Sequence, residues 1–391
     1  MANKKHEISI PVGTLSMVSM RGCEDLCGKI DAYLTEWRSA RHGEVTEDAD
    51  FNGYIRDSYL LKTKCPRFGS GEAKGTILES ARGHDIFIVC DVFNYGVTYD
   101  MYGLKVPMSP DDHFQDIKRI IAAIGGKAHR INVIMPMLYE GRQHKRSTRE
   151  SLDCALALQE LVTMGVENII TFDAHDARVQ NAIPMRGGFE NVQPTYQFIK
   201  ALVNNVEDLD LNNLMIISPD EGGMSRCMYY SSVLGVDLGM FYKRRDYSVI
   251  VNGRNPIVAH DFLGTDVTGK DLIVVDDMIS SGDSVLDIGA KLKEKGAKRI
   301  FICTTFGLFC NGLEKFDAAY EKGHISKVFT TNLNYRPQEL INRPWYQEVD
   351  MSKSIAYLID TLNMDQSISD LLEPVHRINA LLEKKGLKKA K

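Results

Sequence analysis

Two adjacent carboxylates, Asp276 and Asp277, are followed closely by small hydroxyl side chains around Gly282. An acidic pair of this kind accepts hydrogen bonds from sugar hydroxyls or helps to hold a metal ion. Backbone N–H groups at the start of a helix form an anion site, most often for phosphate, which the helix dipole strengthens. The stretch therefore predicts a phosphate site beside two carboxylates. Its candidate residues are Asp276, Asp277, Ser280, Ser281, Gly282, Asp283 and Ser284.

The neighbouring sequence predicts the elements that would position this site. Leu272–Val275 is a short apolar run, typical of a strand buried on both faces of a parallel sheet. Downstream, apolar residues recur at helical spacing from Val285 to Leu292. We therefore expect a strand, a loop and a helix in that order. A simpler interpretation stays open, in which Ser284 or Asp283 only caps the helix and the acidic pair only ends the strand.

Three further polar segments follow apolar runs that predict strands. They are Arg142–Arg146, Asp173–Asp176 and Asp220–Gly223. Ligands of open α/β sheets bind at the carboxyl ends of the strands, so the segments together favour a ligand site. Taken singly, each has a simpler interpretation: a basic turn in solvent for the first, a hydrogen-bonded structural histidine for His175, and a helix cap for Asp220.

Composition narrows the class of protein. The chain has 391 residues, enough for two domains, with an ordinary 44% of hydrophobic and 25% of charged residues. A net charge of -5 argues against a protein that coats nucleic acid, and no apolar run approaches the roughly 18 residues of a membrane span. No secretory signal is visible, and the eight scattered cysteines fit a reducing compartment. We expect a cytoplasmic protein whose partners include neither nucleic acid nor membrane.

Helices that end at glycine and lead into short apolar strands recur along the chain, which predicts βαβ units and an α/β fold. The likeness of the segments after Gly126 and Gly296 suggests two related halves. Tyr242–His260 lacks clear periodicity and predicts a loop or a loose hairpin. A helix is expected over Pro110–Ile124. The other expected strands are Glu7–Val12, Asp85–Cys90, Ile131–Met135, Ile169–Phe172, Leu214–Ser218 and Ile300–Cys303.

Taken in order, several segments resemble motifs of the ribose-phosphate pyrophosphokinase family, over roughly Ile8 to Leu372. Phosphoribosyltransferases share the acidic-pair motif but not the ordered series, so the resemblance favours the pyrophosphokinases. The matching segments are Arg67–Glu72 (RFGSGE), Arg142-Gln143 (RQ), Thr171–His175 (TFDAH), Ser218–Gly223 (SPDEGG), Lys243–Arg245 (KRR) and Asp276–Ile279 (DDMI).

The resemblance implies two phosphoribosyltransferase-like lobes, each a mainly parallel sheet flanked by helices. The N-terminal lobe, on the ATP side, would cover residues 1–192, and the C-terminal lobe, on the ribose 5-phosphate side, residues 193–366. A helix and a basic tail would follow over residues 367–391. The resemblance also implies a homo-oligomer built from dimers, often a hexamer.

The activity implied by the resemblance transfers the pyrophosphoryl group of ATP to the anomeric hydroxyl of ribose 5-phosphate, giving phosphoribosyl diphosphate and AMP. Mg²⁺ would be the cofactor, with His175 and Asp220 near it. Lys243 and Arg245 would be the catalytic residues that stabilise the transferring group. The acidic pair would take the ribose hydroxyls, and Ser280–Ser284 the 5-phosphate. ATP would contact Phe68, Ser70, Glu72, Arg142, Gln143 and His144.

Four positions depart from the family pattern. Ser70, His144 and Ser280 stand where the family has aspartate, and Asp283 stands where it has a small residue. A carboxylate at position 283 would repel a phosphate unless it points away or caps the helix. Two alternatives therefore stay open beside the pyrophosphokinase: a catalytically weak regulatory subunit of such an enzyme and, less favoured, a phosphoribosyltransferase.

Overall fold

The structure is a computed structural model that describes residues 9–41, 51, 53–245 and 257–387, without the side chains of 243–245 and 257–260. The chain forms two compact units, and neither is continuous in sequence. The first unit comprises residues 1–193, 332–335 and 350–373. The second comprises residues 194–331, 336–349 and 374–391.

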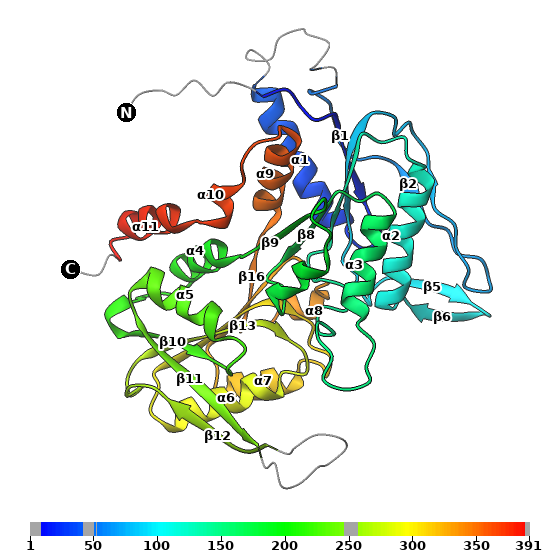
Figure 1. Cartoon of the computed structure of the whole chain (residues 1–391). Helices are drawn as coiled ribbons and strands as arrows, with labels where there is room; N and C mark the ends of the chain where they lie inside the picture. Colours follow the sequence, from blue (N-terminus) through cyan, green and yellow to red (C-terminus); the bar gives the residue numbers. More distant parts are fainter. Residues whose placement is uncertain (1–8, 42–50, 52, 246–256, 388–391) are drawn as a thin grey trace. The chain divides into compact units, whose positions relative to one another are not determined.

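The first unit contains a five-stranded sheet with the strand order β1-β4-β7-β8-β9 (Figure 1). Every neighbouring pair in it is parallel. Parallel strands covered on both faces become continuous apolar runs, as in Ile86–Val89. The strands are β1 (Thr14–Ser19), β4 (His84–Val89), β7 (Arg130–Ile134), β8 (Asn168–Phe172) and β9 (Gly188–Val192).

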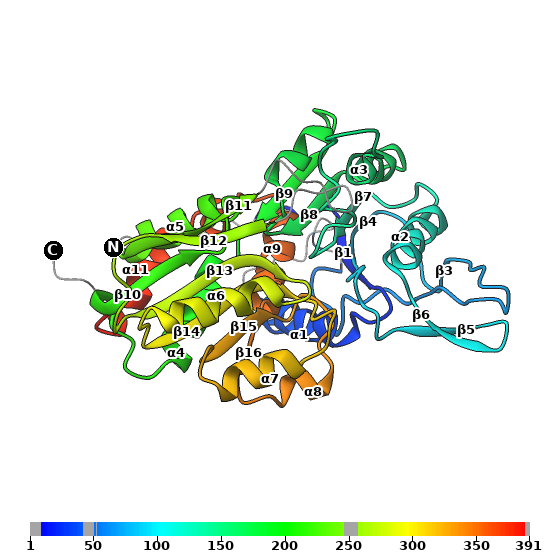
Figure 2. The same cartoon turned by 90° about the horizontal axis from the view of Figure 1, so that it is seen from below.

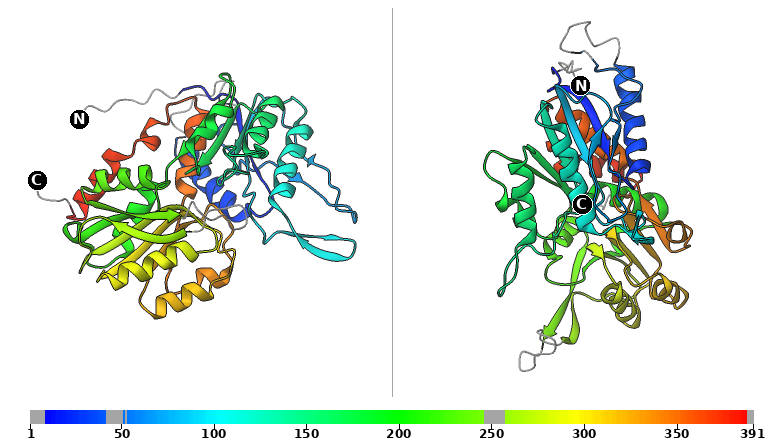
Figure 3. Two further views of the ribbon diagram at one scale, coloured as in Figure 1. Left: turned by 60° about the horizontal axis from the view of Figure 1, so that its bottom comes forward. Right: turned by 90° about the vertical axis from the view of Figure 1, so that its right-hand side faces the viewer.

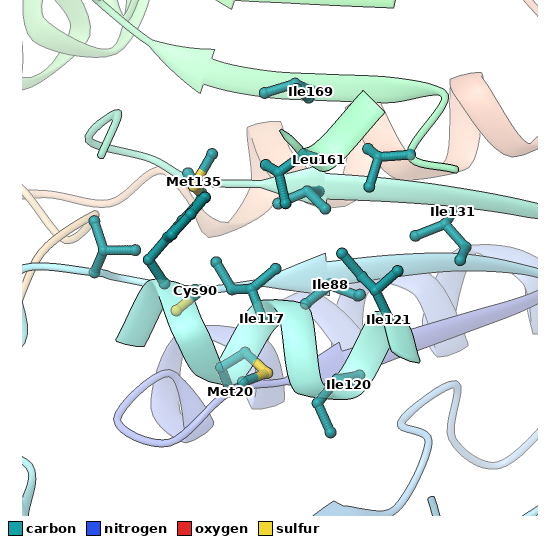
Figure 4. Packing of buried hydrophobic residues seen from close by; sticks show 14 of the residues in the cluster. Met20, Ile88, Cys90, Ile117, Ile120, Ile121, Ile131, Met135, Leu161 and Ile169 are labelled. Atoms are coloured by element: carbon teal, nitrogen blue, oxygen red, sulfur yellow. The ribbon is translucent and has the colours of Figure 1, made fainter. Parts of the chain in front are cut away.

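Helices cover both faces of this sheet (Figure 3). On one face, α2 (Pro110–Ile124) and α3 (Asp153–Thr163) pack on alternate strand residues, so that Ile117, Ile121 and Leu161 meet Ile88 and Ile131 (Figure 4). On the other face, α1 (Glu24–Ala40) packs against β1 and α9 (Ser352–Asn363). The helix α10 (Ser369–Leu372) follows in the same unit.

The bounds of α2 follow from its end residues. The Ser109 side chain accepts the N–H of Asp112, while the Asp112 carboxylate accepts the N–H of Ser109, which is a capping box. Pro110 occupies the first helical position, where its missing N–H costs nothing. Gly125 ends the helix in the left-handed region at φ +61°. The predicted helix over these residues is therefore confirmed.

The second unit contains a seven-stranded sheet with the order β12-β11-β10-β13-β14-β15-β16. All neighbouring pairs are parallel except β11 and β12, which are antiparallel. The strands are β10 (Leu214–Ser218), β11 (Asp237–Arg245), β12 (Ile257–Leu263), β13 (Asp271–Ile279), β14 (Arg299–Gly307), β15 (Lys327–Thr331) and β16 (Tyr346–Val349).

Alternate residues of β13 face two different helical layers. Leu272 and Val274 share a core with α6 (Asp283–Glu294) and α7 (Glu314–Glu321). Ile273 and Val275 share the other core. That second layer consists of α4 (Thr195–Asn205), α5 (Met224–Leu234) and α11 (Val375–Lys384). The short α8 (Gln338–Ile341) contacts β16.

The predicted α/β fold with two mainly parallel sheets is confirmed. The predicted opening strand is wrong over its described part, because residues 9–12 form no strand and β1 begins at Thr14. Pro11 has no N–H to offer a sheet, and the N–H of Val12 donates instead to the carbonyl of Asn363 at 2.7 Å. Glu7 and Ile8 lie outside the described residues. The loose hairpin anticipated over Tyr242–His260 is present in its arms, β11 and β12.

The boundaries drawn at residues 192 and 366 stay a prediction about the two lobes. By contacts, α9 belongs to the first unit although it follows the second sheet in the chain. The buried Arg38 of α1 explains this placement, because its guanidinium donates to Asp360 at 2.8 Å and to Asn363 at 2.7 Å. Within the described residues, no helix is long and apolar enough to span a membrane.

Candidate functional site

The acidic pair lies inside β13, which runs past the predicted end at Val275 as far as Ile279. It continues because Asp276 pairs with Thr304 and Met278 with Phe306 on β14. Asp277 is buried. The backbone N–H of Asp277 donates to Asp276 Oδ1 at 2.9 Å.

Burial and the neighbouring Asp277 raise the pKa of Asp276 well above its usual range. Arg226 of α5 opposes this shift from 3.9 Å. Two carboxylates held this close favour a ligand that donates hydrogen bonds or carries positive charge.

The loop after the acidic pair is shaped by Gly282. This residue is the N-cap of α6 and has φ +85°, which glycine adopts readily. A Cβ added here would lie 2.4 Å from the ring of Phe316, so no side chain fits. No side chain makes a capping hydrogen bond at Gly282, and the simpler interpretation in which Ser284 or Asp283 is the cap does not hold. The first turn of α6 therefore begins at a backbone whose N–H groups suit an anion.

Asp283, the carboxylate that departs from the family pattern, is paired. Its Oδ1 atom lies 2.5 Å from Nζ of Lys315, and this pairing lowers the pKa of Asp283. Lys315 therefore neutralises the charge that would repel a phosphate. The other departure in the loop, Ser280, accepts the N–H of Cys310 at its carbonyl, at 2.9 Å.

Three neighbouring strands of the second unit bring candidate residues to one edge of the sheet. The strand β10 lies between β11 and β13 and is parallel to both. Asp220 follows β10, and its Oδ1 accepts the N–H groups of Gly222 at 3.0 Å and Gly223 at 3.3 Å. Asp220 thus holds the turn before α5 but is not its cap, because the N-cap of α5 is Gly223 and no side chain makes a capping hydrogen bond there. The metal role of Asp220 stays a prediction. Lys243 and Arg245 end β11 beside a β-bulge, and their side chains lie outside the described part.

In the first unit, His175 is presented by a strained turn after β8. Asp173 has φ +44°, which is uncommon for a residue with a side chain. The turn is held because the N–H of Asp173 donates to the carbonyl of Val192, and that of Ala174 to Asn191 Oδ1, both at 3.0 Å. His175 is exposed at the carboxyl end of β8, and its role as a ligand stays a prediction.

His144 lies beside His175, with ring centroids 5.5 Å apart. Its Nε2 atom is 3.3 Å from Oδ2 of Asp176, and burial lowers the pKa of His144. Arg178 also pairs with Asp176, at 2.5 Å, and lowers the pKa of that carboxyl. The structure therefore brings His144 and His175 together, although they come from separate loops.

The remaining predicted nucleotide contacts lie on two turns of the first unit. Arg142 is exposed, and Gln143 donates its side-chain N–H to the carbonyl of Ser151 at 3.3 Å. Phe68 is 53% exposed on the turn Arg67–Glu72, hereafter the RFGSGE turn. Their contacts to ATP stay predictions.

The buried base of the RFGSGE turn fixes its position. Arg67 donates to Asp116 at 2.9 Å, and the N–H of Phe68 donates to the carbonyl of Glu72 at 2.7 Å. Ser70, which replaces the family's aspartate, donates to the Glu72 carboxylate at 2.8 Å. Ser70 and Glu72 therefore form the polar edge of a turn that also carries the exposed Phe68.

Sequence reasoning missed two polar neighbours of these sites, Arg226 and Lys315. Arg226 lies in the first turn of the helix that follows Asp220, and that position was a usable signal. Asp176 belongs to the predicted polar segment Asp173–Asp176, although its pairing with His144 and Arg178 was not predicted. Lys315 had no local signal, because it comes from α7 and meets Asp283 only through tertiary packing.

The candidate residues suit a magnesium ion that arrives with phosphates. Among the described residues, no group of three or more His, Cys, Asp or Glu side chains converges to hold a metal. Mg²⁺ keeps several waters and is bound through one or two carboxylates together with substrate phosphates. Asp220 and the crowded Asp276 offer such carboxylates at the ends of adjacent strands.

The chain is similar to known proteins over most of its length. A family model described as the N-terminal domain of ribose phosphate pyrophosphokinase matches residues 15–165, and a phosphoribosyl transferase domain model matches residues 190–336. The ribose-phosphate pyrophosphokinase of Chlorobaculum tepidum is 25% identical over 328 residues, covering 80% of this chain and 91% of that protein. That of Vibrio parahaemolyticus is 27% identical over 310 residues, covering 78% and 88%.

A solved structure shares the fold. The phosphoribosylpyrophosphate synthetase from Mycobacterium smegmatis superposes with a TM-score of 0.71 at 20% identity, covering 90% of this chain and 99% of that one. Matches to both domain models along one chain separate it from plain phosphoribosyltransferases. The chain belongs to the ribose-phosphate pyrophosphokinase family.

Proposed function

We propose that this chain transfers the pyrophosphoryl group of ATP to the anomeric hydroxyl of ribose 5-phosphate, giving phosphoribosyl diphosphate and AMP. The observation that carries the proposal is the convergence in the second unit. There, β11, β10 and β13 are neighbours and carry the KRR segment, Asp220 and the acidic pair at one edge. The anion-binding start of α6 follows directly.

Ribose 5-phosphate would bind at this edge through both of its polar ends. The 5-phosphate would accept hydrogen bonds from backbone N–H groups at the start of α6 and from the hydroxyls of Ser281 and Ser284. The ribose hydroxyls would donate to Asp276 and Asp277, which relieves the mutual repulsion of the two carboxylates. The Asp283–Lys315 pair keeps the net charge of the loop from opposing the phosphate.

ATP would bind to residues of the first unit. Phe68 offers an exposed ring for the base, and Arg142 offers an exposed guanidinium for the phosphates. Glu72 and Ser70 would hydrogen-bond the polar edge of the base. His144 and His175 would lie near the triphosphate.

In the transfer step, the anomeric oxygen forms a bond to the β-phosphorus, and the bond from that phosphorus to the α,β-bridging oxygen breaks. AMP leaves with that bridging oxygen, and the hydroxyl proton passes to solvent. Lys243 and Arg245 would stabilise the charge that develops on the transferring group. Mg²⁺, when bound, would neutralise charge on the phosphate oxygens, and Asp220 and His175 are its candidate ligands.

The regulatory-subunit alternative rests on the four departures from the family pattern. At two of these positions a neighbouring residue offsets the change: Asp283 forms an ion pair with Lys315, and Ser70 donates a hydrogen bond to Glu72. These contacts favour a working enzyme over one that has lost turnover. The phosphoribosyltransferase alternative would leave the candidate residues of the first unit without a role.

The proposed setting is the cytoplasm, with the chain assembled as a homo-oligomer built from dimers. All eight cysteines are free thiols, and seven of them are buried, which suits a reducing compartment. Light scattering of the purified protein tests the assembly, and a monomer at working concentration would contradict it.

Initial rates of AMP and phosphoribosyl diphosphate formation test the proposed reaction, with Mg²⁺ present and after its removal by a chelator. We expect equal rates of the two products, no turnover without Mg²⁺, and a loss of at least about a hundredfold in kcat for Lys243→Ala. Arg244→Ala removes a charge from the adjacent position of the same strand and serves as the matched control. A natural chain that forms no AMP, or a Lys243→Ala variant with unchanged kcat, would contradict the proposal.

A further inference from the structure

A β-hairpin of the first unit stands beside the RFGSGE turn. It consists of β5 (Thr98–Met101) and β6 (Leu104–Pro107), joined by Tyr102 and Gly103 (Figure 2). No strand is predicted over these residues from the sequence. The hairpin takes no part in the five-stranded sheet of its unit, so its role is not to complete that sheet.

The hairpin and the RFGSGE turn are packed together. The N–H of Tyr102 donates to the carbonyl of Gly69 at 2.9 Å. A Cβ added to Gly71 would lie 2.7 Å from the sulfur of Met101, so the Met101 side chain packs directly on Gly71. The guanidinium of Arg67 lies over the ring of Tyr99, 4.9 Å from its centroid. These contacts fix the hairpin tip relative to Phe68, so a change in the tip should alter the RFGSGE turn.

The tip carries a residue that its backbone does not favour. Tyr102 has φ +51° and Gly103 has φ +77°. A two-residue hairpin turn with both central residues at positive φ strongly prefers Asn or Asp followed by Gly. A tyrosine there is strained, and its side chain is 80% exposed, so burial does not offset the strain. Local rules are most often broken in this way at positions that serve binding or catalysis.

We propose that Tyr102 is a specificity-determining residue that contacts the purine ring of the nucleotide, alongside Phe68. The two exposed aromatic residues lie on backbones joined by one hydrogen bond, and aromatic rings stack on the flat faces of bases. A purine offers a larger face than a pyrimidine, so a second ring favours ATP over UTP. This proposal rests on the assignment of the RFGSGE turn to ATP.

Direct titration of ATP and of UTP into Tyr102→Asn tests the proposal. Asparagine suits the turn, so this variant should be at least as stable as the natural chain in urea unfolding. We expect its Kd for ATP to rise about tenfold, as for the loss of one base-stacking ring, with little change for UTP. In steady state, KM for ATP should rise while KM for ribose 5-phosphate and kcat stay unchanged.

Two further variants separate base contact from a general effect on the hairpin. Tyr102→Phe keeps the ring and should retain ATP affinity. Leu104→Asn removes another exposed apolar side chain, 68% exposed on the same hairpin, and should leave ATP affinity unchanged. Unchanged ATP affinity in Tyr102→Asn, or an equal loss in Leu104→Asn, would overturn the proposal.

The titration distinguishes this proposal from the proposed function. If the natural chain binds ATP but makes no phosphoribosyl diphosphate, the proposed reaction fails, and the comparison of ATP with UTP still decides the role of Tyr102. If the chain turns over and Tyr102→Asn binds ATP normally, only the role of Tyr102 fails. If the natural chain binds no ATP, both are contradicted.

Discussion

Aspartates lie at both ends of the parallel strands, and their charged neighbours differ between the two ends. At the amino ends, Asp85 of β4 lies in register with Arg130 of β7, and Asp271 of β13 lies in register with Arg299 of β14. Both pairs are bidentate, with distances of 2.9 and 2.7 Å in the first and 2.9 and 2.6 Å in the second. The same ion pair at the same register in both sheets agrees with the two related halves suggested by the sequence.

At the carboxyl end of β13, two carboxylates are adjacent in the chain. Asp276 lies against Asp277, and the guanidinium of Arg226 is 3.9 Å from the Asp276 carboxylate. The resulting rise in the pKa of Asp276 shows that the ionised form is disfavoured there. A satisfied aspartate at one end stabilises the sheet, whereas a strained one at the other end is suited to binding a ligand.

The largest expected effect is at an amino end. Asp85→Ala leaves Arg130 without its partner and removes the acceptor of Asn132 and Asn363, at 2.8 and 2.9 Å. We expect a loss of about 3–5 kcal/mol in the free energy of unfolding, measured in urea. Asp271→Ala should cost less, because the Arg299 side chain is 26% exposed whereas that of Arg130 is 11% exposed. Equal losses in the two variants would contradict this ranking.

The next effect concerns the glycine that shapes the carboxyl end. Gly282→Ala places a Cβ against Phe316 in a left-handed conformation, so we expect a loss of about 2–4 kcal/mol in stability together with weaker ribose 5-phosphate binding. Gly83→Ala is the matched control, because Gly83 has φ +74° and open space around it. That control should lose only about 1–2 kcal/mol in urea unfolding. Similar losses would mean that Phe316 does not restrict the loop.

Asp276→Asn should separate binding from stability. Removing one of two crowded carboxylates should raise the Kd for ribose 5-phosphate by about ten- to a hundredfold, as for the loss of a charged hydrogen bond, without lowering the free energy of unfolding. The raised pKa also predicts a pH dependence: stability should fall as pH rises from the usual aspartate range towards the folded-state pKa of Asp276. Asp276→Asn should lack this pH-dependent loss of stability. Urea unfolding at several pH values checks the stability, and calorimetric titration with ribose 5-phosphate checks the affinity. A destabilised variant that binds the sugar normally would mean that Asp276 serves stability and not sugar binding.

The smallest effect is expected at Lys315. Its pair with Asp283 is exposed to solvent, which screens the attraction, so Lys315→Ala should leave the free energy of unfolding almost unchanged. It should nevertheless weaken ribose 5-phosphate binding several-fold at low salt, because the Asp283 carboxylate is then uncompensated. Adding Asp283→Ser in that background should restore affinity. If the single variant binds the sugar as tightly as the natural chain, Asp283 points away from the phosphate.

Periodicity and end residues were sufficient where local rules act alone. The strand Leu214–Ser218 and the helix Pro110–Ile124 were predicted with their observed bounds. A continuous apolar run indicates a strand buried on both faces, and the residues of a capping box indicate the start of a helix. The β5–β6 hairpin was missed because Tyr102-Gly103 replaces the usual Asn-Gly signal. Lys315 was missed because its meeting with Asp283 depends on how α7 packs on α6.

In the proposed reaction, the anomeric hydroxyl attacks the β-phosphorus of ATP. ATP labelled with ¹⁸O in the α,β-bridge shows which phosphorus is attacked. The protein is incubated with this ATP, Mg²⁺ and ribose 5-phosphate, and the products are followed by ³¹P NMR. We predict equal amounts of AMP and phosphoribosyl diphosphate, with the label on AMP. Sugar binding without formation of AMP, or a label that leaves with pyrophosphate, would contradict the account.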